Sequence, residues 1–177
     1  ILLMYYPGQE GGHALADILV GDVNPSGKLT VSWPKQLIDN PASLHYPGWK
    51  DVHYGEGLFV GYRYYDAKDV DPLFPFGHGL SYTIFAYSGL KLPKEVRAGE
   101  DFEVSLTVEN AGEVPGQEVV QLYIRDVEST LIRPVKELQD FTKIALDPGE
   151  SQKVSFNLNP RSLSYYDPHQ HAWVAEA

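Results

Sequence analysis

The chain has 177 residues, enough for one medium domain or for a small domain with part of another. Hydrophobic residues make up 43% and charged residues 21%, which is ordinary for a globular protein, and no apolar run is long enough to cross a bilayer. The 14 basic and 24 acidic residues give a net charge of −10 without a basic cluster, which argues against nucleic acid as a partner. Because cysteine is absent, disulfides, thiolate nucleophiles and cysteine metal sites are excluded.

The first 34 residues have the pattern of a βαβ unit. Residues 1–6 are a continuous run of large apolar side chains, which predicts a strand buried on both faces of a parallel sheet and is not typical of a signal peptide. Residues 12–20 carry apolar side chains at helical spacing, and Gly21 is expected as the left-handed cap. Residues 29–33 are extended again. We therefore expect residues 1–34 to be the end of an α/β domain.

The loop "GDVNPSGKLT" resembles a phosphate-binding loop but departs from it at two points. Five residues, and not four, separate Gly21 from Gly27, and Leu29 stands where the hydroxyl of a Ser or Thr is required. The order of elements is also reversed, because the predicted helix ends here, and the dipole at a helix C-terminus repels phosphate. We interpret the loop as a helix-to-strand turn in which Lys28 faces solvent or a carboxylate.

Residues 35–82 lose periodicity and are rich in proline, glycine and aromatic side chains. Disordered linkers are usually poor in aromatic residues, so this segment is expected to be an ordered connector packed on a surface. Its most concentrated motif is "GYRYYD", in which Arg63 lies among three tyrosines. We expect Arg63 to form a buried pair with Asp66 or Glu56 that holds the connector in place.

Residues 83–177 are predicted to be an all-β sandwich of the immunoglobulin type. Short alternating runs are separated by turns such as "NAGEVPG" and "DPGES". The expected strands are residues 87–92, 102–109, 120–124, 135–146, 154–158 and 172–175. This count of six is one short of a seven-stranded sandwich, so we expect the last strand to be missing.

Two clusters of polar residues invite a metal interpretation. Asp66, Asp69 and Asp71 lie close together, but the central glycine and closing glutamate of a calcium loop are missing. His169 and His171 stand two apart near a turn, with no third ligand predicted beside them. A solvated turn and surface histidines are therefore expected, and the sequence indicates no metal and no cofactor.

Carboxylates among aromatic and glycine residues suggest sugar binding, because a pyranose stacks on rings and hydrogen-bonds to carboxylates. Glu10, Glu56 and Asp66 have such surroundings. The favoured alternative is structural, with Glu10 at a helix start and Glu56 bonded to backbone in a turn. We retain Glu56, Tyr62 and Arg63 as candidate substrate-binding residues and assign no catalytic residue.

Three motifs in order, "PGQEGGHALADILVGDVNPSGKLTVSWP", "YGEGLFVGYRYYD" and "PLFPFGHGLSYTIF", resemble glycoside hydrolase family 3, which contains β-glucosidases and β-xylosidases. The resemblance covers essentially the whole chain. It implies an α/β remnant, the connector, and then a fibronectin type III-like sandwich. In that family a retaining mechanism uses an aspartate from an N-terminal barrel and, in many members, a glutamate from an earlier loop of the second domain. Both would precede Ile1, and no residue here matches either motif.

The resemblance therefore implies the C-terminal supporting portion of a β-glycosidase, inactive by itself, whose partner is the rest of its own chain and whose substrate is a β-glycoside. Alone, the chain is expected to expose the apolar residues 1–6 and to aggregate. The alternatives are a carbohydrate-binding or adhesion module and a structural spacer. Against such a module, Trp33 and Trp49 precede the sandwich, which contains only Trp173.

Overall fold

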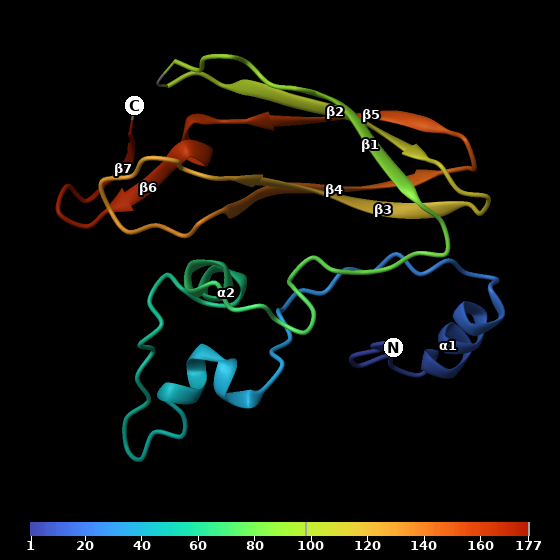
Figure 1. Cartoon of the computed structure of the whole chain (residues 1–177), viewed down its shortest axis with the longest axis horizontal. Coiled ribbons are helices and arrows are strands. Elements are labelled where there is room, and N and C mark those ends of the chain that lie inside the picture. The colour runs from blue at the N-terminus through green and yellow to red at the C-terminus, as the bar shows by residue number, and fades with distance from the viewer. Residues whose placement is uncertain (98, 177) are drawn as a thin grey trace.

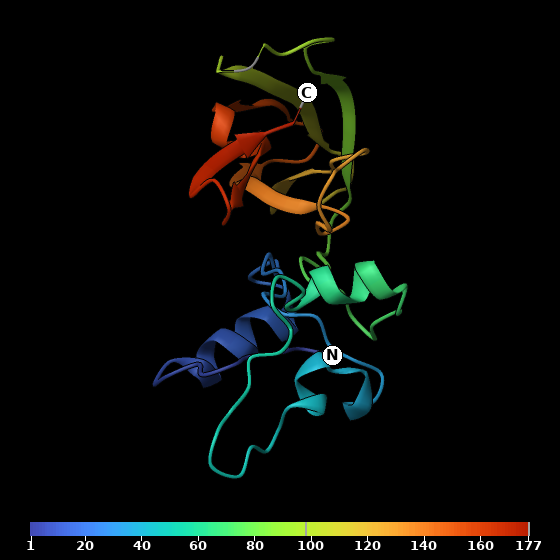
Figure 2. The same ribbon diagram turned by 90° about the vertical axis from the view of Figure 1, so that its left-hand side faces the viewer.

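The computed structural model describes residues 1–97 and 99–176 and separates into two parts (Figures 1 and 2). A β-sandwich contains all the strands, and the N-terminal part with the helices α1 and α2 lies below it in both views. The strands are β1 Phe85–Lys91, β2 Phe102–Asn110, β3 Gly116–Ile124, β4 Glu137–Leu146, β5 Ser151–Leu158, β6 Ser164–Asp167 and β7 Ala172–Ala175. The helices are α1 Gly11–Val20, α2 Tyr62–Lys68 and the 3₁₀ helices η1 Leu37–Asp39, η2 Pro41–Leu44 and η3 Pro160–Leu163.

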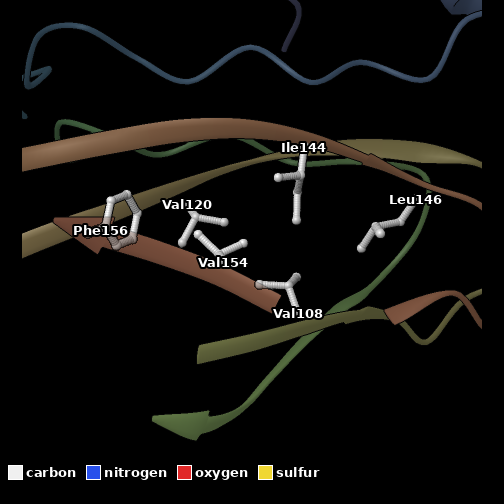
Figure 3. Close-up of a cluster of buried hydrophobic side chains, with 6 residues drawn as sticks. All are labelled: Val108, Val120, Ile144, Leu146, Val154 and Phe156. Carbon is white, nitrogen blue, oxygen red and sulfur yellow. The ribbon is translucent and has the colours of Figure 1, made fainter. Parts of the chain in front are cut away.

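The sandwich consists of antiparallel sheets that face each other. One sheet has the order β1-β2-β5, a second joins β3 to β4, and β6 pairs with β7 as a separate hairpin. From Val154 to Leu158, strand β5 buries every second side chain and exposes the others, as the alternating sequence predicts. The inward side chains from both sheets point toward one another and form the core (Figure 3). They are Val108, Val120, Ile144, Leu146, Val154 and Phe156.

All six predicted strands are present, but the described residues contain a seventh. This additional strand is β6, which lies before β7 and not after it, so the expected count of six is one too few. Strand β6 has only four residues and no alternating burial, since two neighbouring tyrosines stand at its centre. It therefore leaves no periodic signal in the sequence and is recognised only through its pairing with β7.

In the N-terminal part, the helix is confirmed and the first strand is not. Helix α1 ends at Gly21, which has φ 87° and donates its N–H to the carbonyl of Ile18. Residues 1–6 lie outside any helix or strand, and Ile1 and Tyr6 are fully exposed. The predicted strand is wrong for this structure because a strand needs a neighbour to receive its backbone hydrogen bonds, and no described segment pairs with these residues.

The connector is ordered by backbone hydrogen bonds and by a helix that the sequence pattern did not predict. Residues 29–33 run beside residues 73–78: Leu29 donates to His78, Gly77 to Leu29 and Trp33 to Phe74, although only one bridge, and no strand, results. Helix α2 is not predicted from the sequence because it is only two turns long and, with tyrosine at most of its nonpolar positions, shows no clear apolar periodicity. No helix within the described ranges combines the length and apolar character needed to span a membrane.

Asn110 is a fully buried polar residue at the end of β2. Its side-chain amide donates to the carbonyls of Val114 and Leu146 at 2.9 and 3.0 Å. Its Oδ1 accepts from the hydroxyl of Thr83 and, at 3.2 Å, from the N–H of Gly112. One side chain thus joins the entry into the sandwich, the turn after β2 and the end of β4.

We expect Asn110→Ala to lower the free energy of unfolding by about 3 kcal/mol, because it leaves buried donors and acceptors without partners. The measurement is urea denaturation of the chain, followed by circular dichroism. Asn157→Ala, at an exposed position of β5, is the matched control and should have little effect. Equal stability of the two variants would contradict the structural role of Asn110.

Candidate functional site at the contact between connector and sandwich

The two parts of the molecule meet along a polar surface that we call the docking contact. On one side, the docking contact is formed by the loop after α1, by helix α2 and by the end of the connector. On the other side, it is formed by β3, β4, the loop between β2 and β3 and the loop between β3 and β4 (Figure 1). On the N-terminal side the residues are Asn24, Ser26, Lys28, Tyr62, Arg63, Asp66 and Gly77. On the sandwich side they are Pro115, Glu118, Gln121, Lys136, Glu137, Leu138 and Lys143.

Asn24 joins three segments of the docking contact. Its Nδ2 donates to the carbonyl of Pro115 at 2.9 Å, while its Oδ1 accepts from Ser81 Oγ at 2.9 Å and from the N–H of Tyr82 at 2.8 Å. The approach is close, since a Cβ on Gly116 would lie 2.9 Å from Asn24 Nδ2. Asn24 therefore holds the end of the connector against the turn that precedes β3.

Lys28 lies beside Asn24 in the same loop and forms a partly buried ion pair. Its Nζ lies 2.9 Å from Glu118 Oε2 and donates to the carbonyl of Gly79 at 3.0 Å. The two side chains are only 15% and 12% exposed, so solvent screens this pair weakly. Tyr87 donates to Glu118 Oε1 at 3.0 Å, and burial, followed by the charge of Glu118, raises the pKa of Tyr87. The expected carboxylate partner of Lys28 is thus present.

Helix α2 brings Tyr62 against the sandwich. The hydroxyl of Tyr62 accepts from the N–H of Leu138 at 2.9 Å, and its ring stacks on Phe76 and meets the edge of Tyr123. Burial, with smaller contributions from Tyr62 and the Asp66 carboxylate, raises the pKa of Tyr123 to about 12. Tyr62 is consequently engaged in packing and hydrogen bonding between the two parts.

Arg63 does not pair as the sequence predicts. Its guanidinium lies 3.5 Å from Glu137 at the start of β4, and Asp66 lies 3.1 Å from Lys136. The expected pairing of Arg63 with Asp66 or Glu56 is wrong because helix α2 presents both charges to a sandwich loop that offers complementary charges. Glu137 is shared with Arg133, at 3.1 Å.

Glu56 lies apart from the other two candidates. It lines a hollow of about 410 Å³ with Tyr64 and Lys68, which lie on the face of α2 opposite Tyr62 and Arg63. The structure therefore brings Tyr62 and Arg63 together in the docking contact and leaves Glu56 in the hollow. The docking partners on the sandwich escaped sequence analysis because they are far away along the chain and form no local motif.

The remaining candidates occupy surface positions. Glu10 precedes α1 and lies 2.7 Å from His13, and both side chains are exposed. In the turn between β6 and β7, the N–H of His169 and the amide of Gln170 donate to Asp167, which lowers the pKa of Asp167. Within residues 1–97 and 99–176, no three histidine or acidic side chains are arranged to hold a metal ion.

Two family models match the chain. The model described as the glycosyl hydrolase family 3 C-terminal domain matches residues 1–82, and the model described as the fibronectin type III-like domain matches residues 118–177. Thermostable beta-glucosidase B of Acetivibrio thermocellus is 50% identical over 179 residues, and the match covers 100% of this chain and 24% of the relative. Beta-glucosidase BoGH3A of Bacteroides ovatus is 47% identical, with 99% of this chain and 24% of the relative covered.

Solved structures agree with these matches. The GH3 beta-glucosidase of Bifidobacterium adolescentis superposes with a TM-score of 0.90 at 42% identity, covering 96% of this chain and 25% of that chain. The beta-glucosidase of Kluyveromyces marxianus in complex with glucose has a TM-score of 0.86 at 43% identity, covering 95% of this chain and 20% of that chain. The chain thus spans about a quarter of the length of the relatives that it matches.

We expect a double-mutant cycle of Lys28→Met and Glu118→Gln to give a coupling energy of about 1–3 kcal/mol, because the pair is mostly removed from water. Unfolding in urea is the measurement. Lys153 and Glu103 provide the matched control, because they lie 3.1 Å apart, close to the 2.9 Å of Lys28 and Glu118, but their side chains are 61% and 49% exposed. The coupling should be smaller there, and an equal value in both cycles would contradict the role of burial at the docking contact.

We expect the free energy of unfolding to fall as the pH rises from 10 toward 12, the span between the ordinary pKa of tyrosine and that of Tyr123 in the structure. In this window the unfolded chain loses the Tyr123 proton while the folded chain keeps it, so ionisation favours unfolding. Tyr123→Phe should reduce the slope in urea titrations at several pH values, whereas Tyr54→Phe, at a 90% exposed residue, should not. An unchanged slope for Tyr123→Phe would be inconsistent with the raised pKa.

Proposed function

Since the chain belongs to glycoside hydrolase family 3, we propose that it forms the C-terminal portion of a retaining β-glycosidase, which hydrolyses O-glycosyl bonds in β-glucosides or related β-glycosides. In this proposal the chain supports the catalytic domains and is inactive by itself. Its partner is the remainder of the same enzyme. The relatives are named beta-glucosidases and are about four times as long as the match, which supports this assignment.

The proposed division of labour rests on the chemistry of glycoside hydrolysis. A retaining enzyme needs two carboxyl groups about 5 Å apart, one as nucleophile and one as acid/base. By resemblance to the family, we expect neither group among the residues of this sequence. We therefore assign both groups to the three quarters of the relatives that lie outside the match.

The docking contact is the observation that carries the supporting role. It combines the hydrogen bonds that the Asn24 amide donates and accepts, the mostly buried Lys28–Glu118 pair and the ion pairs of α2. Such directional contacts fix the orientation of two parts more strictly than apolar burial does. In this proposal the sandwich, residues 83–177, is thereby held at one angle to the α/β remnant, residues 1–34, and to the connector, residues 35–82.

Several large apolar side chains of the N-terminal part are exposed and are available for catalytic domains to pack on. Ile1 is fully exposed, as is Tyr6, and Leu19 and Val20 of α1 are 66% and 71% exposed. Exposed apolar patches of this kind mark interaction surfaces or aggregation sites. The proposal assigns these side chains to the contact with the rest of the enzyme.

A chimera tests the proposal. The matched quarter of the Acetivibrio thermocellus beta-glucosidase is replaced by this chain, and hydrolysis of nitrophenyl β-glucoside is followed by absorbance. We expect the chimera to retain activity within about tenfold of the parent, because the two sequences are 50% identical over the whole match. The chain alone should show no hydrolysis above the uncatalysed background.

The docking variants make the test specific. In the chimera, Lys28→Met should lower the temperature at which activity is lost, while Lys153→Met, at an exposed pair, should not. Hydrolysis by the isolated chain would overturn the supporting role. A folded chimera without activity would count against the assignment to this enzyme class.

A further inference from the structure

We propose that the hollow lined by Glu56 binds one neutral pyranose ring, and that a sandwich loop completes it. This inference rests on the proposed function, because the enzyme class directs attention to sugars. The hollow, named here the connector hollow, is lined by Pro41, Leu44, His45, Gly55, Glu56, Phe59, Tyr64, Ala67, Lys68 and Ile132. Its volume of about 410 Å³ falls within the range of small-molecule sites.

Three elements of the connector and one of the sandwich form the connector hollow. Helix η2 and the segment that follows it supply one wall, and helix α2 supplies another. Ile132 comes from the loop between β3 and β4, which lies over α2 in Figure 1. The site is therefore complete only when the sandwich is docked.

The position of the walls follows from the docking contact. Arg63 and Asp66 attach one face of α2 to Glu137 and Lys136 of the sandwich. The opposite face of α2 then lines the hollow, and the loop that carries Ile132 is held beside it. The contact that places one face of α2 against the sandwich therefore also places the loop of Ile132 beside the hollow.

The segment after η2 is closed by a close contact between His45 and Gly55. The ring of His45 lies so close to Gly55 that a Cβ on residue 55 would overlap the imidazole. Glu56 follows Gly55 in the chain, and both line the hollow together with His45. This close approach gives the segment a defined shape despite its lack of regular structure.

The chemistry of the lining indicates a neutral, polyhydroxylated ligand. Phe59 and Tyr64 provide aromatic walls, on which the C–H face of a pyranose packs. Glu56 and Lys68 carry opposite charges, so an anion would meet the carboxylate and a cation the ammonium group. Neither of these side chains takes part in an ion pair within residues 1–97 and 99–176. Both remain available to hydroxyl groups.

A titration of the isotope-labelled chain with methyl β-glucopyranoside, followed by NMR, tests the inference. We expect saturable shifts at Gly55, Glu56 and Ala67, with Kd on the order of 1 mM, because a monosaccharide makes few contacts. Glu56→Gln and Ile132→Ser should each weaken binding by about fivefold or more. Ile132 is 83% exposed, so its replacement leaves the fold intact.

The control is Phe141→Ser, at a 63% exposed residue of β4 outside the lining, which should bind as the original chain does. Shifts that do not saturate, that glycerol reproduces, or that survive both lining variants would overturn the inference. The titration involves no turnover. Sugar binding with an inactive chimera would contradict only the proposed function, and an active chimera without binding would contradict only the connector hollow.

Discussion

Two asparagine side chains at the crossing between connector and sandwich determine the arrangement of this molecule. Asn24 accepts from Ser81 and Tyr82 and donates to Pro115, and Asn110 accepts from Thr83 while donating to carbonyls of the sandwich. A side-chain amide has a donor and an acceptor at fixed geometry, so it can join two segments that lack a regular ladder. Asn24 and Asn110 hold the chain on the two sides of this crossing, so the sandwich cannot rotate relative to the connector without breaking these hydrogen bonds.

The charged contacts depend on that geometry. Only when the crossing is fixed does Lys28 meet Glu118, and only then does α2 lie opposite the start of β4. Partly buried ion pairs carry a desolvation cost that offsets much of their attraction, and their clearest benefit is that alternative arrangements leave charges unpaired. The docking contact is therefore better suited to fix orientation than to add stability. A supporting domain of an enzyme needs this property.

The same constraint links the sandwich to the connector hollow. Arg133 is 10% exposed and joins Asp126 and Glu137 within the loop that carries Ile132, and Glu137 in turn receives Arg63 of α2. The ion pairs of Arg133 therefore hold the conformation of the loop, and the pair of Glu137 with Arg63 attaches the end of the loop to α2. A sandwich that acted only as a spacer would have no need for such an internally braced loop beside a hollow. In this view, the fibronectin type III-like domain contributes both orientation and a wall of a ligand site.

The sequence by itself determined the elements whose signal is local. Alternating side chains predicted strands such as β2, β3 and β5, a glycine at the right spacing predicted the end of α1, and three ordered motifs predicted the family that the domain matches confirm. Tertiary structure alone decided the partner of Arg63, the helical state of residues 62–68, the strand β6 and the unpaired state of residues 1–6. Each of these depends on a hydrogen-bonding or charged neighbour from another part of the fold, or on the lack of one. Periodicity reports which face of an element is buried, but it carries no information about which distant residue will lie opposite that face.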